Sequence, residues 1–137
     1  VQWNAQANAG FTTGTPWLKV HSDYKEINVA AQEKDPDSVL NYYRKLTATR
    51  KAPEYKEVFT YGKTVPAYQD SETVMAYYRE TKSQRVLVAA NFGREAVSIK
   101  LEYPVKKVLL SNQNHTDCPE GMMNLDTCEV IVLECEK

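Results

Sequence analysis

The chain has 137 residues, of which 42% are hydrophobic and 26% charged, with a formal net charge of -1 at pH 7. This composition is typical of a globular domain and excludes disordered, collagen-like and membrane-spanning classes. Its Lys and Arg residues are scattered, so neither a nucleic acid nor an anionic membrane is an expected partner.

The first seventeen residues predict a loop that carries aromatic side chains to a surface. They have neither the period of a helix nor the alternation of a strand, and they set Trp3, Phe11 and Trp17 among Gly, Thr, Asn and Pro. Such loops serve binding or catalysis when a rigid scaffold presents them. We therefore expect the scaffold to lie upstream of Val1, in a larger protein.

One helix is expected from about Pro36 to Lys51. Asp35 is the predicted N-cap, Pro36 suits the first helical position, and Pro53 ends the element. Apolar side chains then follow at helical spacing: Val39, Leu40, Tyr43 and Leu46. This apolar face needs cover, which we expect from a second copy of the chain or from its own β-domain.

Short apolar runs separated by turn residues follow, and they predict an antiparallel β-sandwich. The fold class is therefore mainly β, with one helix and a long loop before the sandwich. Val86–Ala90 is apolar on both faces and should be central, whereas Ala96–Glu102 alternates and should have one face in water. The expected strands are Glu57–Tyr61, Thr73–Glu80, Arg85–Phe92, Ala96–Glu102, Val108–Ser111 and Cys128–Glu134.

No residue of the chain is predicted to be catalytic, and no cofactor or metal is expected. His21 and His115, the two histidines, lack acidic or cysteine neighbours at metal-ligand spacing and are expected at the surface. Asp35 and Asp37 are explained by helix capping. Alternation along the strands sends the remaining strand carboxylates to solvent: Glu95, Glu102, Glu129 and Glu134.

The cysteines predict a reducing compartment. Cys118, Cys128 and Cys135 are odd in number and show no C-x-x-C spacing, which favours free thiols in a cytoplasmic protein. A disulfide between Cys118 and Cys128 stays open at this point.

The aromatic loop allows two interpretations. Trp3, Phe11 and Trp17 either pack the loop down or offer their faces to sugar rings in a concave site. The second interpretation would suit a stand-alone carbohydrate-binding or domain-docking module.

Several segments resemble the α-glucosidases of the α-amylase superfamily, glycoside hydrolase family thirteen, and among them the oligo-1,6-glucosidase and dextran glucosidase group. The resemblance covers nearly the whole chain. The segments that carry it are Gln2-Trp3-Asn4, Asn8 to Trp17, Tyr24 to Val29, Asp37-Ser38-Val39, Tyr42 to Leu46, Arg50-Lys51 and Val88 to Phe92.

The resemblance implies a domain organisation and a site. Residues 1–52 would be a remnant of a catalytic (β/α)8 barrel, with an active-site rim loop at 1–34 and the last barrel helix at about 36–51. Residues 53–137 would be the C-terminal antiparallel β-domain. Because barrel loops build the active site, the implied substrate-rim residues are Gln2, Trp3, Asn4, Phe11 and Trp17.

The resemblance also implies what the chain lacks. The family's three catalytic carboxylates lie on earlier barrel strands and have no matching positions in this sequence. Asn4 stands where the family usually has Asp, and His21-Ser22-Asp23 stands where Asn-Pro-Asn is usual.

The resulting expectation is a non-catalytic C-terminal part of a bacterial, cytoplasmic, retaining α-glucosidase. The whole enzyme would cleave α-1,6 or α-1,4 bonds at the non-reducing end of oligosaccharides, and the barrel would be the missing partner. Trehalose-6-phosphate hydrolase and sucrose isomerase are alternatives within the enzyme class.

Overall fold

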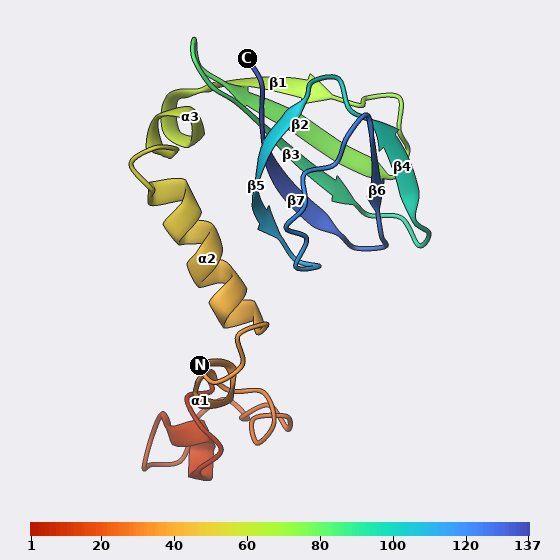
Figure 1. The fold of residues 1–137 in the computed structure, drawn as a ribbon. Coiled ribbons are helices and arrows are strands. Elements are labelled where there is room, and N and C mark those ends of the chain that lie inside the picture. Colours follow the sequence, from red (N-terminus) through yellow and green to blue (C-terminus); the bar gives the residue numbers. More distant parts are fainter. The chain divides into compact units, whose positions relative to one another are not determined.

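The computed structural model describes all residues from 1 to 137, and the chain divides into two compact units, Val1–Thr47 and Ala48–Lys137. None of its helices combines the length and apolarity needed to span a membrane. The helical elements are η1 (Ala7–Gly10), α1 (Val29–Gln32), α2 (Val39–Lys51) and α3 (Lys56–Tyr61) (Figure 1). The strands are β1 (Lys63–Ala67), β2 (Val74–Glu80), β3 (Arg85–Asn91), β4 (Val97–Lys100), β5 (Val105–Ser111), β6 (Met122–Leu125) and β7 (Val130–Cys135).

Helix α2 begins three residues later than the sequence predicted. Its cap is Ser38, whose Oγ accepts a hydrogen bond from Asn41 N at 3.2 Å and donates one to Gln32 O at 2.7 Å. Asp35 instead closes a turn, since its Oδ1 accepts from Asp37 N at 3.0 Å. The prediction that Asp35 caps the helix was therefore wrong, because a second capping residue three positions on is buried and bonded to α1.

The apolar face of α2 is only partly covered. Val39 and Tyr43 are 74% and 63% exposed, Leu40 and Leu46 are half-buried, and no residue of α2 is buried. Cover of this face by the β-domain or by a second copy remains a prediction.

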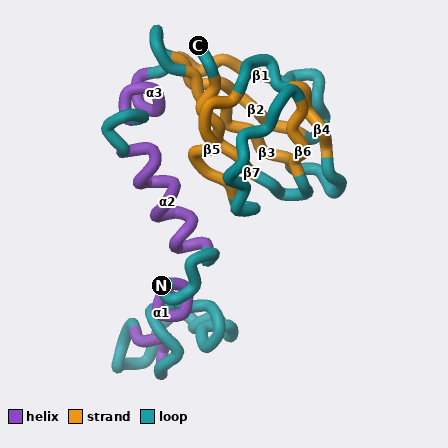
Figure 2. Tube along the Cα trace, in the orientation of Figure 1, coloured by secondary structure: helices purple, strands orange, loops and turns teal.

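The second unit is an antiparallel β-sandwich, as the sequence predicted. One sheet has the order β1-β2-β3-β7-β5 and the other pairs β4 with β6; Figure 2 shows the strands of both in orange. All pairings are antiparallel. The core lies between the sheets and contains Leu87, Leu133, Ile99 and Leu125. Strand β3 is central, and Ile99 of β4 points inward while Ser98 and Lys100 face water, so both strand predictions are confirmed.

The predicted strand Glu57–Tyr61 is wrong, because these residues form most of helix α3. Val58 is fully buried, and Tyr55 packs edge-on against Phe59 with ring centroids 6.4 Å apart. The Arg79 guanidinium donates to Val58 O at 3.3 Å and to Phe59 O at 3.2 Å, which satisfies carbonyls at the end of the helix. A short apolar run such as this fits both the periodicity of a helix and the alternation of a strand, and tertiary contacts decide which of the two forms.

The first two residues of the predicted strand Cys128–Glu134 lie outside β7. Cys128 has a φ of 57° and lies in a turn before β7, not in a strand. Glu129 is fully buried instead of solvent-facing: its Oε2 accepts from Asp126 N at 2.7 Å, and its Oε1 lies 3.0 Å from His115 Nδ1. All three cysteines are free thiols, so the structure contains no Cys118–Cys128 disulfide.

A single buried amide links two loops of the sandwich, the β3–β4 and the β6–β7 connections. Asn91, 1% exposed, donates through Nδ2 to Glu95 O, Leu125 O and Asp126 O at 2.9, 3.2 and 3.0 Å, and its Oδ1 accepts from Gly93 N at 2.8 Å. The end of β3 is thereby joined to the entry of β4 and the end of β6.

We expect Asn91→Ala to lower the free energy of unfolding of the sandwich by about 2–4 kcal/mol, because it leaves buried carbonyls without a donor. Asn91→Asp should cost more, since a carboxylate would face those carbonyl oxygens. Urea denaturation followed by far-UV circular dichroism measures both, with the exposed Glu72→Ala as control. An Asn91→Ala midpoint equal to that of the control would contradict this role.

Candidate functional site

The aromatic loop is held by main-chain hydrogen bonds to a short helix of the same unit. Val29 N donates to Gln2 O at 2.9 Å and Ala30 N to Trp3 O at 3.0 Å. On its other side, Trp3 N donates to Ala9 O at 2.9 Å. The segment Val1–Asn4 therefore lies between α1 and the turn that contains η1.

That turn is left-handed. Asn8, Ala9 and Gly10 have φ values of 54°, 54° and 71°. A Cβ added to Gly10 would lie about 2.5 Å from the Asn4 Oδ1 atom, so the Asn4 side chain packs directly on the glycine. Asn4 Oδ1 also accepts from Gln6 N at 2.9 Å, and a glycine at position 10 is thus required by both space and backbone conformation.

A second asparagine fixes the next stretch of the loop. Asn8 Nδ2 donates to Thr12 O at 3.2 Å and to Gly14 O at 3.0 Å. Phe11 N donates to Asn8 O at 3.3 Å. These contacts give the segment around Phe11 a defined shape without apolar burial.

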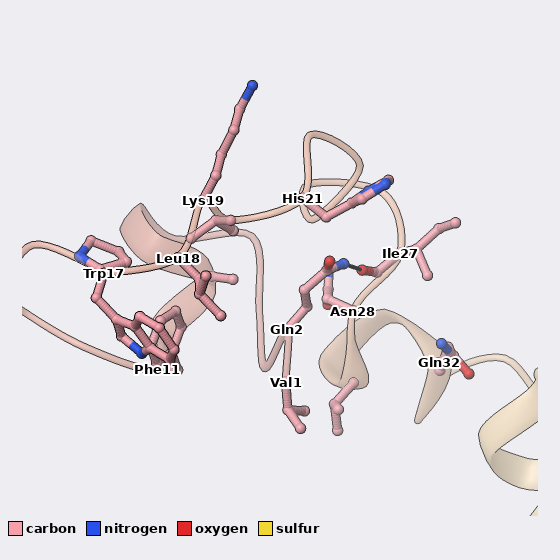
Figure 3. Close-up of a pocket in the computed structure, with 14 residues that line it drawn as sticks. Val1, Gln2, Phe11, Trp17, Leu18, Lys19, His21, Ile27, Asn28 and Gln32 are labelled. Carbon is pink, nitrogen blue, oxygen red and sulfur yellow. Dashed lines mark hydrogen bonds between the residues drawn. The ribbon is translucent and has the colours of Figure 1, made fainter.

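A pocket of about 540 Å³ opens beside this loop, entirely within the first unit (Figure 3). Among the residues predicted for the substrate rim, Gln2, Phe11 and Trp17 line it, whereas Trp3 and Asn4 do not. Trp17 is 91% exposed and Phe11 48%. Figure 3 shows Phe11 and Trp17 together at one side of the pocket and Gln2, Ile27 and Asn28 together at another.

Polar lining residues were missed in the sequence. Asn28 is buried and caps α1, accepting from Ala31 N at 2.9 Å and donating to Tyr24 O at 3.0 Å. An N-cap signal before Val29 could have located it. The other polar lining residues that were missed are Lys19, His21 and Gln32.

A His–Asp–Gln chain of contacts stands at the edge of the pocket. His21 Nδ1 lies 2.6 Å from Asp23 Oδ1, and Gln2 Nε2 donates to the same oxygen at 3.2 Å. The His21 hydrogen bond holds the pKa of the Asp23 carboxyl below its usual value of 3.8; partial burial opposes this effect and the Gln2 amide adds to it. His21 is exposed at the surface, as predicted.

No Asp or Glu lines the pocket. Glycoside hydrolysis with two carboxyl groups therefore has no acid and no nucleophile here. The arrangement offers aromatic faces, amides, one imidazole and one amine. These groups can bind and orient a polar ligand.

Comparison with known families separates the chain into two matched parts. Residues 1–62 match the model described as "Alpha amylase, catalytic domain", and residues 74–132 match "Alpha-amylase SusG C-terminal domain". The chain belongs to the α-amylase family of glycoside hydrolases. Its mainly antiparallel β architecture agrees with the C-terminal β-domain of such enzymes.

Individual relatives lie within the same family. The chain is 43% identical to an oligo-1,6-glucosidase of Heyndrickxia coagulans and 37% identical to a trehalose-6-phosphate hydrolase of Bacillus subtilis, over 85% and 91% of its own length. It superposes on isomaltulose synthase from Erwinia rhapontici NX5 with a TM-score of 0.88 at 36% identity over 99% of its length. It spans 20%, 22% and 24% of these three proteins.

We expect Gly10→Ala to destabilise the first unit by about 1–3 kcal/mol, since an added Cβ meets Asn4 and a positive φ disfavours alanine. Gly14→Ala is the matched control, because its Cβ would meet nothing closer than 3.7 Å. Both tryptophans lie in this unit, so fluorescence-monitored denaturation reports its unfolding. Equal midpoints for the two variants would refute the role of Gly10.

The Asp23 carboxylate should make the loop sensitive to acid. Because its pKa is lower in the folded state than in the unfolded state, its stabilising contribution is complete above about pH 4 and is lost as the pH falls through the folded pKa. Carboxyl ¹³C NMR should give a midpoint below 3.8 that rises toward 3.8 in His21→Ala. A midpoint unchanged by that substitution would show that His21 is not the cause.

Proposed function

We propose that this chain is the C-terminal part of a retaining α-glucosidase that cleaves α-1,6 or α-1,4 glucosidic bonds at the non-reducing end of oligosaccharides. The observation that carries the proposal is that a segment matching the family's catalytic domain forms a pocket with aromatic and amide lining and no carboxylate. In this proposal the chain supplies contacts to the sugar, and the chemistry comes from groups elsewhere in the enzyme.

Within this proposal residues 1–52 complete the catalytic barrel and residues 53–137 form the C-terminal β-domain. The loop at 1–34 is the active-site rim, and the helix at about 36–51 is the last barrel helix. The division of the chain into units at Thr47 and Ala48 supports a boundary in this region, as do the family matches at 1–62 and 74–132.

The barrel is also the proposed cover for the first unit. Six large apolar side chains of its first 34 residues are about half or more exposed: Val1, Trp3, Phe11, Trp17, Leu18 and Ile27. Burying one such side chain is worth roughly 1.5–3 kcal/mol, and apolar groups gathered this densely mark an interface or a binding groove.

The proposed rim residues are Gln2, Trp3, Asn4, Phe11 and Trp17. Phe11 and Trp17 offer aromatic faces to a sugar ring, and Gln2 offers a carboxamide. In this proposal Trp3 and Asn4 support the rim through the backbone, since Trp3 N and Asn4 N both donate to the carbonyl of Ala9, a residue that lines the pocket.

Without the barrel the chain should be inert. Retaining hydrolysis needs a nucleophile and an acid/base carboxyl about 5–5.5 Å apart, and the pocket has neither. The relatives named above include a hydrolase of trehalose 6-phosphate and an isomaltulose synthase, so these activities are the alternatives within the enzyme class. A bacterial cytoplasm is the proposed location, supported by bacterial relatives and three free thiols.

A second candidate function is a stand-alone sugar-binding module. The specific observation in its favour is Trp17, which is 91% exposed and borders the pocket. Such a module would bind sugar without any barrel.

A chimera tests the proposal. The part of the Heyndrickxia coagulans oligo-1,6-glucosidase that aligns with this chain is replaced by residues 1–137, and hydrolysis of isomaltose is measured. We expect activity in the chimera and none from the 137-residue chain with a chromogenic α-glucoside. Trp17→Ala in the chimera should lower kcat/KM about tenfold, since losing about 50 Å² of indole contact costs roughly 1.3 kcal/mol.

Phe92→Ala is the matched control, because Phe92 is an exposed aromatic residue of the sandwich. A folded but inactive chimera would contradict the proposal, and so would hydrolysis by the chain alone. Calorimetric titration of the chain with isomaltose separates the second candidate: binding that disappears in Trp17→Ala would favour the stand-alone module.

A further inference from the structure

The orientation of the Gln2 carboxamide is dictated by its two neighbours. Gln2 Nε2 donates to Asp23 Oδ1 at 3.2 Å and also to the carbonyl oxygen of Ile27. An ionised carboxylate and a carbonyl accept hydrogen bonds and donate none. Only the NH₂ group can therefore face them, and the oxygen of the amide must point the other way.

Asp23 is kept in its accepting form by His21. The 2.6 Å separation of His21 Nδ1 from Asp23 Oδ1 requires a proton between the two atoms, since two lone pairs at this distance would repel. Asp23 N lies 3.5 Å from the same nitrogen, which is too long to compete. His21 therefore donates to Asp23 through Nδ1–H. The imidazolium and the neutral tautomer with its hydrogen on Nδ1 can both do so.

Backbone hydrogen bonds also hold Gln2 and the turn that faces it in place. Gln2 O accepts from Val29 N at 2.9 Å, and Ile27 N and Glu26 N both donate to Asp23 O, at 2.8 and 2.9 Å. The turn that carries Asp23 and Ile27 is thus closed on itself and joined to the segment of Gln2. The amide cannot rotate without breaking two hydrogen bonds at once.

Gln2 Oε1 is left without a partner in the protein, on a residue that lines the pocket. We propose that Gln2 Oε1 is a hydrogen-bond acceptor for a hydroxyl group of the bound glucoside and that Asp23 is the positioning residue that aims it. This inference rests on the proposed function. It assigns a neutral O–H donor to this place in the pocket, because an anionic oxygen would be repelled there.

The pairing joins segments that are distant in the sequence. Asp23 and Gln2 are separated by 21 positions in the sequence.

The test uses the isomaltose-hydrolysing chimera. Gln2→Met keeps the length of the side chain and removes the acceptor, so KM should rise about five- to tenfold with kcat within about twofold, the pattern of a lost uniform binding contact. Asp23→Leu should raise KM by a similar factor. Asp23→Asn should recover most of the loss, since its Oδ1 can still accept from Gln2.

Gln69→Met is the matched control, because Gln69 is an exposed glutamine of the second unit. An active chimera in which Gln2→Met and Gln69→Met have the same KM overturns the inference and leaves the proposed function standing. An inactive parent chimera counts against the proposed function instead.

NMR of the ¹⁵N-labelled 137-residue chain tests the inference without any activity. The Gln2 side-chain amide protons should exchange at least tenfold more slowly than those of Gln69, and Asp23→Leu should remove this protection. Equal exchange rates would overturn the inference whatever the chimera does.

Discussion

The first unit depends on hydrogen bonds between its opening residues and the segment around α1. Of its 47 residues, only Ala9, Asn28 and Ser38 are buried, and two of these three are polar. Every other buried apolar side chain of the protein belongs to the second unit. The loop therefore keeps its shape through contacts such as Val29 N to Gln2 O, and not through an apolar core.

This constraint explains why the aromatic residues are exposed. A unit with almost no core cannot bury Trp3, Phe11 and Trp17 against itself, so these side chains are available to a ligand or to another surface. Hydrogen bonds to main-chain atoms do not require their burial, and the loop can be ordered while its apolar groups face outward. The same arrangement makes the loop sensitive to small backbone changes, because a hydrogen bond is lost over a few tenths of an ångström.

The sequence predicted the parts of the structure that local rules decide. β3 was located because it is apolar on both faces, and the exposed face of β4 because its alternation is regular. Helix α3 was missed because Val58 and Phe59 fit both the helical period and strand alternation. The contacts that favour a helix come from Arg79, which lies on strand β2. Burial of Glu129 was missed because alternation holds inside a strand, and this residue stands just before β7.

The same distinction applies to the site. The aromatic residues were found because their resemblance to a known loop is local. The contact between Gln2 and Asp23 joins positions 21 residues apart, and no spacing rule predicts it.

Asn4 and Asp23 differ in charge, and their contacts explain where the loop needs a carboxylate. Asn4 uses Oδ1 to accept from Gln6 N and packs on Gly10; an aspartate has the same acceptor and nearly the same shape, so the turn does not require the neutral residue. The carboxylate of this network is that of Asp23, which lies beside Gln2 and pairs with His21. Paired there, the charge orients an amide and stays out of the pocket lining.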